Sequence, residues 1–191
     1  MIDIRHDAAL RRETPPAAQP DRRYGALPWR QNKRGEVRLL LIAPRRGGRW
    51  TVPEVVPDSG RAPYLSASLG AFEQAGVIGE IRPAPVAEYR RGDDAGASAD
   101  GILRMKLFSL RIRGTLTNWP QRAGWVRQWF GFAEAAAAVA DPGLAETIRA
   151  LGGEPARLTQ IDRIAAAAGA HAASESAVEM AAAAAKDPPA P

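Results

Sequence analysis

The chain has 191 residues, room for one domain of ordinary size with tails, and its 46% hydrophobic and 25% charged residues are typical of globular proteins. It has no cysteine, which excludes disulfide scaffolds, thiolate zinc sites and cysteine nucleophiles, and its two histidines lie in the expected tails, which argues against a histidine base. The net charge of +5 is carried mostly by arginine, a side chain suited to bidentate contacts with phosphate or carboxylate.

Three zones follow one another along the chain. Residues 1–22 carry three prolines and scattered charges without a period, so we predict a flexible arm. Residues 23–151 hold the apolar stretches of one compact domain. Residues 152–191 are rich in alanine and offer few large side chains for a core, so we predict a low-complexity, partly helical tail.

Short apolar or alternating stretches in the middle zone predict strands. Residues 37–43 form a continuous apolar run of strand length, which is typical of a buried central strand. Turn sequences rich in arginine, aspartate and glycine lie at 45–48 and 92–96. In chain order the expected strands are 24–30, 37–43, 49–53, 86–91, 103–112 and 124–130.

Helices are expected between and after these strands. In residues 63–75, Leu65, Leu69 and Phe72 recur at helical spacing and predict the apolar face of a helix. A proline suits its first turn, and a glycine suits the position after its last. The predicted architecture is α/β or α+β, a mixed sheet sandwiched between helices. The other expected helices are 132–140 and 143–151, separated by the sequence Asp-Pro-Gly.

Several separated segments resemble one protein family. Residues 48–53 (GRWTVP), a loop with Gly60 and a helix that ends in residues 71–77 (AFEQAGV) are similar in order and spacing to the Nudix hydrolases, and so are residues 24–28 (YGALP) and the Trp-Phe pair at 129–130. The branch that the chain resembles is that of the diphosphoinositol polyphosphate phosphohydrolases. The resemblance covers about residues 23–151. It implies a Nudix-like fold, hydrolysis of a diphosphate linkage and a Mg²⁺ or Mn²⁺ cofactor.

The chain departs from this family at the charged positions of the Nudix box. Positions that shape turns and pack the helix are retained, whereas the family's carboxylates are mostly lost. The resemblance therefore implies a scaffold whose usual metal site is gone or weakened, with Glu73 as the one retained box carboxylate and candidate metal ligand. When the box is aligned through Gly76, its first glycine corresponds to Val55 and its isolated glutamate to Arg61. Its arginine and the next glutamate correspond to Leu69 and Gly70. Its two closing glutamates correspond to Glu73 and Gln74.

These observations predict a Nudix-like domain with a degenerate box, a bacterial-type small protein that binds a phosphorylated ligand and is non-catalytic or weakly active. The ligand would be a nucleotide or an inositol phosphate, and a non-catalytic binder needs no cofactor. Basic side chains beside the box and on nearby strands are the candidate ligand contacts. They are Arg45, Arg46, Arg49, Arg90, Arg91, Arg104 and Lys106.

Two further interpretations stay open, so the sequence does not decide whether the chain is an enzyme. An active Mg²⁺-dependent pyrophosphohydrolase of nucleoside-diphosphate-linked or inositol pyrophosphate substrates would rebuild its site from relocated acids. A regulatory protein would contact a protein partner through the alanine-rich tail, whose helices offer few anchor residues. The acids available for a rebuilt site are Glu54, Asp58, Glu73, Glu88, Asp93 and Asp94.

Other partners are less well supported by the sequence. Specific nucleic-acid binding is not expected, because no zinc-finger or RRM-type motif occurs and the charge excess is modest. Trp119, Trp125 and Trp129 are expected to pack in the core, although an exposed one would suit base stacking or a partner. No apolar run approaches the roughly 18 residues of a membrane span, and the N-terminus lacks the apolar stretch of a signal peptide. We therefore expect a cytoplasmic protein without a membrane partner.

Overall fold

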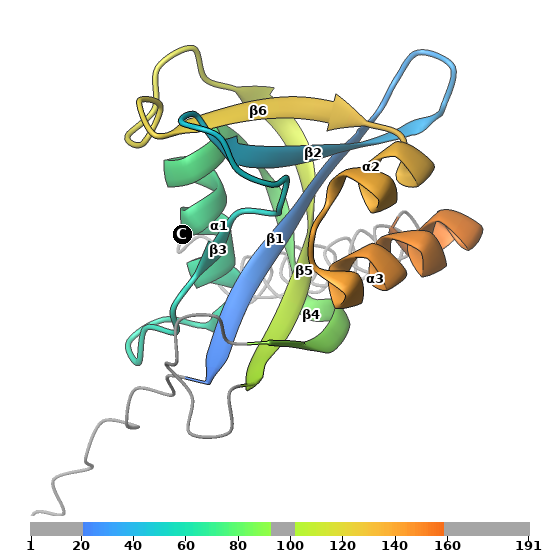
Figure 1. The fold of residues 1–191 in the computed structure, drawn as a ribbon. Coiled ribbons are helices and arrows are strands. Elements are labelled where there is room, and N and C mark those ends of the chain that lie inside the picture. The colour runs from blue at the N-terminus through green and yellow to red at the C-terminus, as the bar shows by residue number, and fades with distance from the viewer. Residues whose placement is uncertain (1–20, 93–101, 159–191) are drawn as a thin grey trace, which may run out of the picture.

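The computed structural model describes residues 21–92 and 102–158 of the chain (Figure 1). The predicted arm up to residue 20, the acids at positions 93 and 94, and the tail from residue 159 onwards lie outside the described residues. Leu158, at the end of the described part, is fully buried in the core. No helix in the described part is long and apolar enough to cross a membrane.

A mixed sheet of six strands lies at the centre of the described residues (Figure 1). Five strands follow the order β4-β5-β1-β2-β6, and the short β3 pairs with the start of β1. β1 and β5 run parallel, while the other pairs are antiparallel. The strands are β1 (Arg22–Gln31), β2 (Val37–Pro44), β3 (Glu54–Val55), β4 (Val77–Gly92), β5 (Ile102–Thr115) and β6 (Trp125–Phe130).

Helices cover both faces of this sheet. α1 (Pro63–Ala75) lies on one face, and α2 (Phe132–Ala138) and α3 (Pro142–Gly153) lie on the other (Figure 1). The predicted helix over residues 63–75 is therefore confirmed in its bounds, and the two later helices are confirmed within two residues or fewer. The architecture is the expected mixed α+β sandwich.

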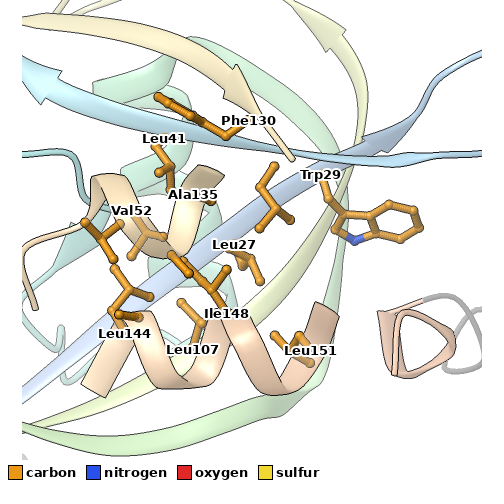
Figure 2. Packing of buried hydrophobic residues seen from close by; sticks show 14 of the residues in the cluster. Leu27, Trp29, Leu41, Val52, Leu107, Phe130, Ala135, Leu144, Ile148 and Leu151 are labelled. Atoms are coloured by element: carbon orange, nitrogen blue, oxygen red, sulfur yellow. The ribbon is translucent and has the colours of Figure 1, made fainter. Parts of the chain in front are cut away.

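The alternation of side chains along the strands divides the core into two layers. Leu27 and Trp29 of β1 belong to the layer beneath α2 and α3, whereas Tyr24 and Ala26 belong to the layer beneath α1. Figure 2 shows the first layer, in which apolar side chains of α3 meet those of the strands. The α3 side chains that repeat at helical spacing toward the strands are Leu144, Ile148 and Leu151.

Two strand predictions need correction. Residues 49–53 do not form a strand: only Trp50 and Thr51 make isolated bridges, and the strand of this segment is β3, just after Pro53. β4 begins directly after α1, at Val77, instead of at residue 86. Prolines at 83 and 85 break the strand pattern in the sequence. The structure tolerates them because β4 is an edge strand with bulges there.

The predicted apolar face of α1 is also wrong. Leu65 and Leu69 are 45% and 37% exposed. The face that packs against the sheet consists of small residues, because small side chains let the helix backbone approach the strands closely. The buried residues of α1 are Ser66, Ala67, Gly70, Ala71 and Ala75.

Candidate functional site

The end of α1 fixes the residues that the resemblance aligns with the closing part of the Nudix box. Gly76 ends the helix in the left-handed conformation with φ of 60°, and its N–H donates to the carbonyl oxygen of Phe72 at 3.0 Å. A β-carbon at position 76 would lie 2.6 Å from the Trp119 ring, so glycine is required there for space as well as for backbone angle. This end of the helix holds Glu73 and Gln74 in the last turn of α1.

Val55 of β3 covers the helix at Gly70. An added β-carbon at position 70 would lie 2.5 Å from Cγ1 of Val55, closer than such atoms approach in proteins. The glycine therefore allows β3 to lie directly on α1. The resemblance aligns Val55 with the first glycine of the Nudix box and Gly70 with one of its glutamates.

The amide of Gln74 joins α1 to the backbone of Glu54. Its Nε2 donates to the Glu54 carbonyl oxygen at 2.7 Å, and its Oε1 accepts from the Glu54 N–H at 3.2 Å. Both halves of the amide are thus used to hold β3. Its carbonyl oxygen, the group that a metal ion would take, is already engaged by the backbone.

The Glu54 carboxylate binds Arg91 of β4 in a bidentate pair. The two N–H···O distances are both 2.7 Å, and the side chains are 24% and 23% exposed. The hydrogen bonds to Glu54 raise the pKa of Arg91 above its ordinary value, against the smaller opposing effect of burial. One expected ligand contact is therefore paired with an internal carboxylate.

The remaining acids do not gather around α1. Asp58 accepts from the N–H of Gly60 at 3.0 Å, and Glu88 pairs with Lys106 at 3.0 Å. The Glu73 side chain is half-buried and has no hydrogen bond or ion pair within residues 21–92 and 102–158. No three acids or histidines of the described part lie close enough to hold a metal ion. These residues do not fit the Mg²⁺ or Mn²⁺ ion that the resemblance implies.

A positively charged hollow lies at the start of β1 and β5, the end of β4 and the start of α3. We call it the arginine cleft; its volume is about 740 Å³. Strand register places Arg23 opposite Met105 and Arg91 opposite Leu103, which puts both arginines on the α3 face of the sheet. The cleft is lined by Arg23, Arg49, Trp50, Thr51, Glu54, Arg91, Gly92, Leu103, Ala140, Asp141 and Pro142.

Of the seven predicted ligand contacts, the cleft brings together Arg49 and Arg91. Arg90 and Arg104 are cross-strand partners, and Lys106 faces Glu88, so strand alternation places these side chains on the other face of the sheet. Arg104 is also paired with Asp21 at 3.3 Å. The two arginines at 45 and 46 lie in the turn after β2 and do not line the cleft.

Among the cleft residues that sequence reasoning did not predict, three contribute a charge or an aromatic ring. Arg23 lies at the start of β1, where only the strand register shows that it shares a face with Arg91. Trp50 packs edge-on against Phe130 with ring centroids 5.1 Å apart. Asp141 caps α3, and its Oδ1 accepts from the Gly143 N–H at 2.9 Å. The Asp-Pro-Gly sequence was a detectable signal for this cap.

Tyr89 is partly buried and lies close to Asp141 of the cleft. Its hydroxyl oxygen and Oδ2 of Asp141 are both buried, and neither makes a hydrogen bond within the described residues. Burial raises the pKa of Tyr89 far above its ordinary value, and the negative charge of Asp141 adds to the effect. The phenol is therefore held neutral beside the wall of the cleft.

Comparison with known proteins identifies the fold through solved structures. No family model matches the sequence, and no curated protein matches it. Among solved structures, a NUDIX hydrolase from Nitrosomonas europaea is similar with a TM-score of 0.53 and 18% identity over 70% of each chain. An Ap4A hydrolase of C. elegans matches with a TM-score of 0.52 and 15% identity, over 70% of this chain and 98% of that one.

A third similar structure is a domain in complex with a ligand. The NUDIX domain of Shewanella oneidensis NrtR, complexed with ADP ribose, matches with a TM-score of 0.51 and 13% identity, over 67% of this chain and 85% of that one. At identities this low the similarity defines the fold and leaves the activity open. The described domain has the Nudix fold.

Proposed function

We propose that this chain is a member of the Nudix superfamily, in the branch that resembles diphosphoinositol polyphosphate phosphohydrolases, and that it binds a phosphorylated small molecule without ordinary Nudix hydrolysis. The observation that carries the proposal is the closed contact between β3 and α1. Val55 occupies the space over Gly70, and the Gln74 amide is bonded on both sides to Glu54. A carboxylate cluster for Mg²⁺ has no room to form at this surface.

The arginine cleft supports the ligand half of the proposal. Guanidinium groups bind phosphate in a planar, bidentate geometry, and Arg49 makes no hydrogen bond or ion pair within the described residues. The volume of about 740 Å³ is in the range of small-molecule sites. The ADP ribose and Ap4A named for two similar structures contain linked phosphates, so a nucleotide of this type or an inositol phosphate is the ligand class that we propose.

Calorimetric titration tests this proposal. ADP-ribose, inositol hexakisphosphate and inorganic pyrophosphate are each titrated into the full chain, first without and then with Mg²⁺. Arg49→Ala is expected to weaken binding of the best of these about tenfold, the value of one charge-assisted hydrogen bond. Arg149→Ala, which removes an exposed arginine of α3, is the matched control and is expected to leave the affinity unchanged.

Two results would contradict the proposal. Absence of binding by all three compounds removes the ligand role, and equal affinities for the wild type and Arg49→Ala place the ligand elsewhere. Hydrolysis is measured in the same samples by chromatography, which detects AMP and ribose phosphate from ADP-ribose and inorganic phosphate from pyrophosphate. Turnover that requires Mg²⁺ would reject the non-catalytic part of the proposal and leave the ligand part intact.

An active pyrophosphohydrolase stays as a second candidate because of one observation. The Glu73 carboxylate is half-buried in the last turn of α1 and is not paired within the described residues, so it is available to a metal ion. Under this alternative Glu73→Gln abolishes any Mg²⁺-dependent turnover. Unchanged turnover in that variant would reject it.

A further inference from the structure

A second positively charged surface lies at the β6 edge of the sheet, away from the arginine cleft. It is formed by the loop from residue 117 to 124, which leads into β6, and by the turn after β2 (Figure 1). Two hollows of about 640 and 420 Å³ share Arg45, Trp119 and Arg122. Neither hollow has a lining residue in common with the cleft. We call this surface the β6 basic site and define it by Arg45, Trp119, Arg122, Trp125 and Arg127.

The charges of the β6 basic site are not neutralised by acids. The residues that line its two hollows include three arginines and no aspartate or glutamate. None of these arginines forms an ion pair within the described part of the chain. Arg45 has only long contacts of 3.5 Å to the carbonyl oxygens of Arg122 and Trp125. A bound anion would relieve the repulsion between these like charges.

The frame of the site is fixed by hydrogen bonds to α1 and to the loop itself. Arg127 donates to the carbonyl oxygens of Gly76 at 3.1 Å and Leu116 at 2.8 Å, and its guanidinium carbon lies 4.3 Å from the centroid of the Trp119 ring. Trp119 donates to the carbonyl oxygen of Gln74 at 3.1 Å. Arg127 and Trp119 therefore support the loop, while the more exposed Arg45 and Arg122 are left to meet a ligand.

An indole ring lies beside these arginines. Trp125 is partly exposed, and its Nε1 donates to Gln121 Oε1 at 3.1 Å, which fixes the orientation of the ring. No cation or other ring stacks on Trp125 within the described residues, whereas Trp119 and Trp129 each carry a guanidinium over the ring. A surface that binds single-stranded nucleic acid combines two features: cations that contact the phosphate backbone and an aromatic face on which a base stacks.

We propose that the β6 basic site binds single-stranded nucleic acid without sequence preference, with phosphates at Arg45 and Arg122 and a base against Trp125. A stacked base needs an aromatic face, which an acidic peptide would leave unused. Reading of base edges is not part of the proposal, because the charged groups of the site are guanidinium groups suited to phosphate. The site has no residue of the cleft, so the proposal is independent of the function proposed above.

The test measures fluorescence anisotropy of a labelled oligothymidylate of about ten nucleotides added to the full chain. Arg45→Ala and Arg122→Ala are each expected to weaken binding about fivefold, the upper value for an exposed charge contact. Both side chains are exposed, so the variants are expected to fold, and thermal unfolding checks this. Arg149→Ala is the matched control, since it removes the same charge from an exposed position of α3.

Two further measurements separate nucleic acid from other anions. Bound oligothymidylate is expected to quench tryptophan fluorescence, and polyglutamate of equal length is expected to bind more weakly and without this quenching. Arg49→Ala is expected to weaken pyrophosphate binding but not oligothymidylate binding. The proposal is overturned if polyglutamate binds as well as the oligonucleotide, if quenching is absent, or if the Arg45 and Arg122 variants bind like the control.

Discussion

Glu54 belongs to two regions of the molecule, the β3–α1 contact and the arginine cleft. The polar groups of the first region are satisfied by each other, whereas the second region keeps a charged group without a partner in the described part of the chain. At the β3–α1 contact, the backbone of Glu54 and the amide of Gln74 satisfy each other, and Val55 fills the remaining space. In the cleft, the Glu54 carboxylate pairs with Arg91, while Arg49 has no hydrogen bond or ion pair within the described residues. The surface of α1 where the resemblance predicts a metal site is thus closed by packing, while a charged surface beside it stays open to a ligand.

The largest effect is expected from Gly70→Ala, which tests the closed contact. Alanine is normally about 1 kcal/mol better than glycine in a helix interior, so propensity alone predicts stabilisation. Here the added methyl group meets Val55, a stiff β-branched side chain, and we expect a loss of about 1–3 kcal/mol in the free energy of unfolding. Urea unfolding of wild type and variant measures it.

The control for this variant is Gly153→Ala at the end of α3. Nothing lies within 4 Å of a β-carbon added at position 153, so no loss from crowding is expected. If Gly70→Ala were as stable as the wild type or more stable, Val55 would not close the surface of α1.

Gln74→Glu introduces the carboxylate that the resemblance predicts at this position and tests the amide bridge. A carboxylate accepts from the Glu54 N–H but cannot donate to the Glu54 carbonyl oxygen. We expect a loss of about 1–2 kcal/mol at neutral pH, the cost of one unsatisfied, partly buried group. Thermal unfolding measures the stability of the variant. The control is Gln128→Glu, which places the same charge on an exposed residue of β6. Equal stability of the two variants would contradict a role for the bridge.

Tyr89→Phe tests the phenol that lies close to Asp141 of the cleft. The folded state raises the pKa of Tyr89, so above about pH 10 the unfolded chain loses this proton more readily than the folded one. The wild type should therefore lose stability as pH rises through that region, by up to about 1.4 kcal/mol per pH unit for this one group. The variant should lack this part of the slope. Parallel curves of unfolding free energy against pH for the two proteins would reject the assignment.

The smallest effect is expected from Glu54→Gln, which links the two regions. The change removes the charge that holds Arg91, so pyrophosphate should bind the cleft about threefold more tightly, within the range of a partly exposed ion pair. Glu80→Gln breaks the exposed pair with Arg113 and should leave the affinity unchanged. Calorimetry that finds weaker or equal binding for Glu54→Gln would show that Glu54 does not compete with the ligand.

Much of the fold could be predicted because it depends on local patterns. The apolar run of β2 and the proline and glycine at the ends of α1 act over a few residues and appear in the structure at the expected places. The face of α1 could not be predicted by the same means. Periodicity marked Leu65 and Leu69, but close packing against the sheet selected the small residues instead.

The candidate site was less predictable for a physical reason. Arg90 and Arg91 are neighbours in the sequence, yet strand alternation sends their side chains to opposite faces of the sheet. Arg23 and Arg91 are far apart in sequence and line the same cleft because β5 pairs with both β1 and β4. A list of basic residues cannot show which of them converge.

The sequence by itself determined the order of most elements and predicted a Nudix-like arrangement of turns and helix in which the box carboxylates are lost. These depend on residue type and on spacing along the chain. Only the tertiary structure decided that Val55 fills the space over Gly70, that Gln74 is engaged by Glu54, and that two expected arginines share a cleft with Arg23. These depend on sheet register and on contacts between segments distant in sequence, which no local pattern encodes.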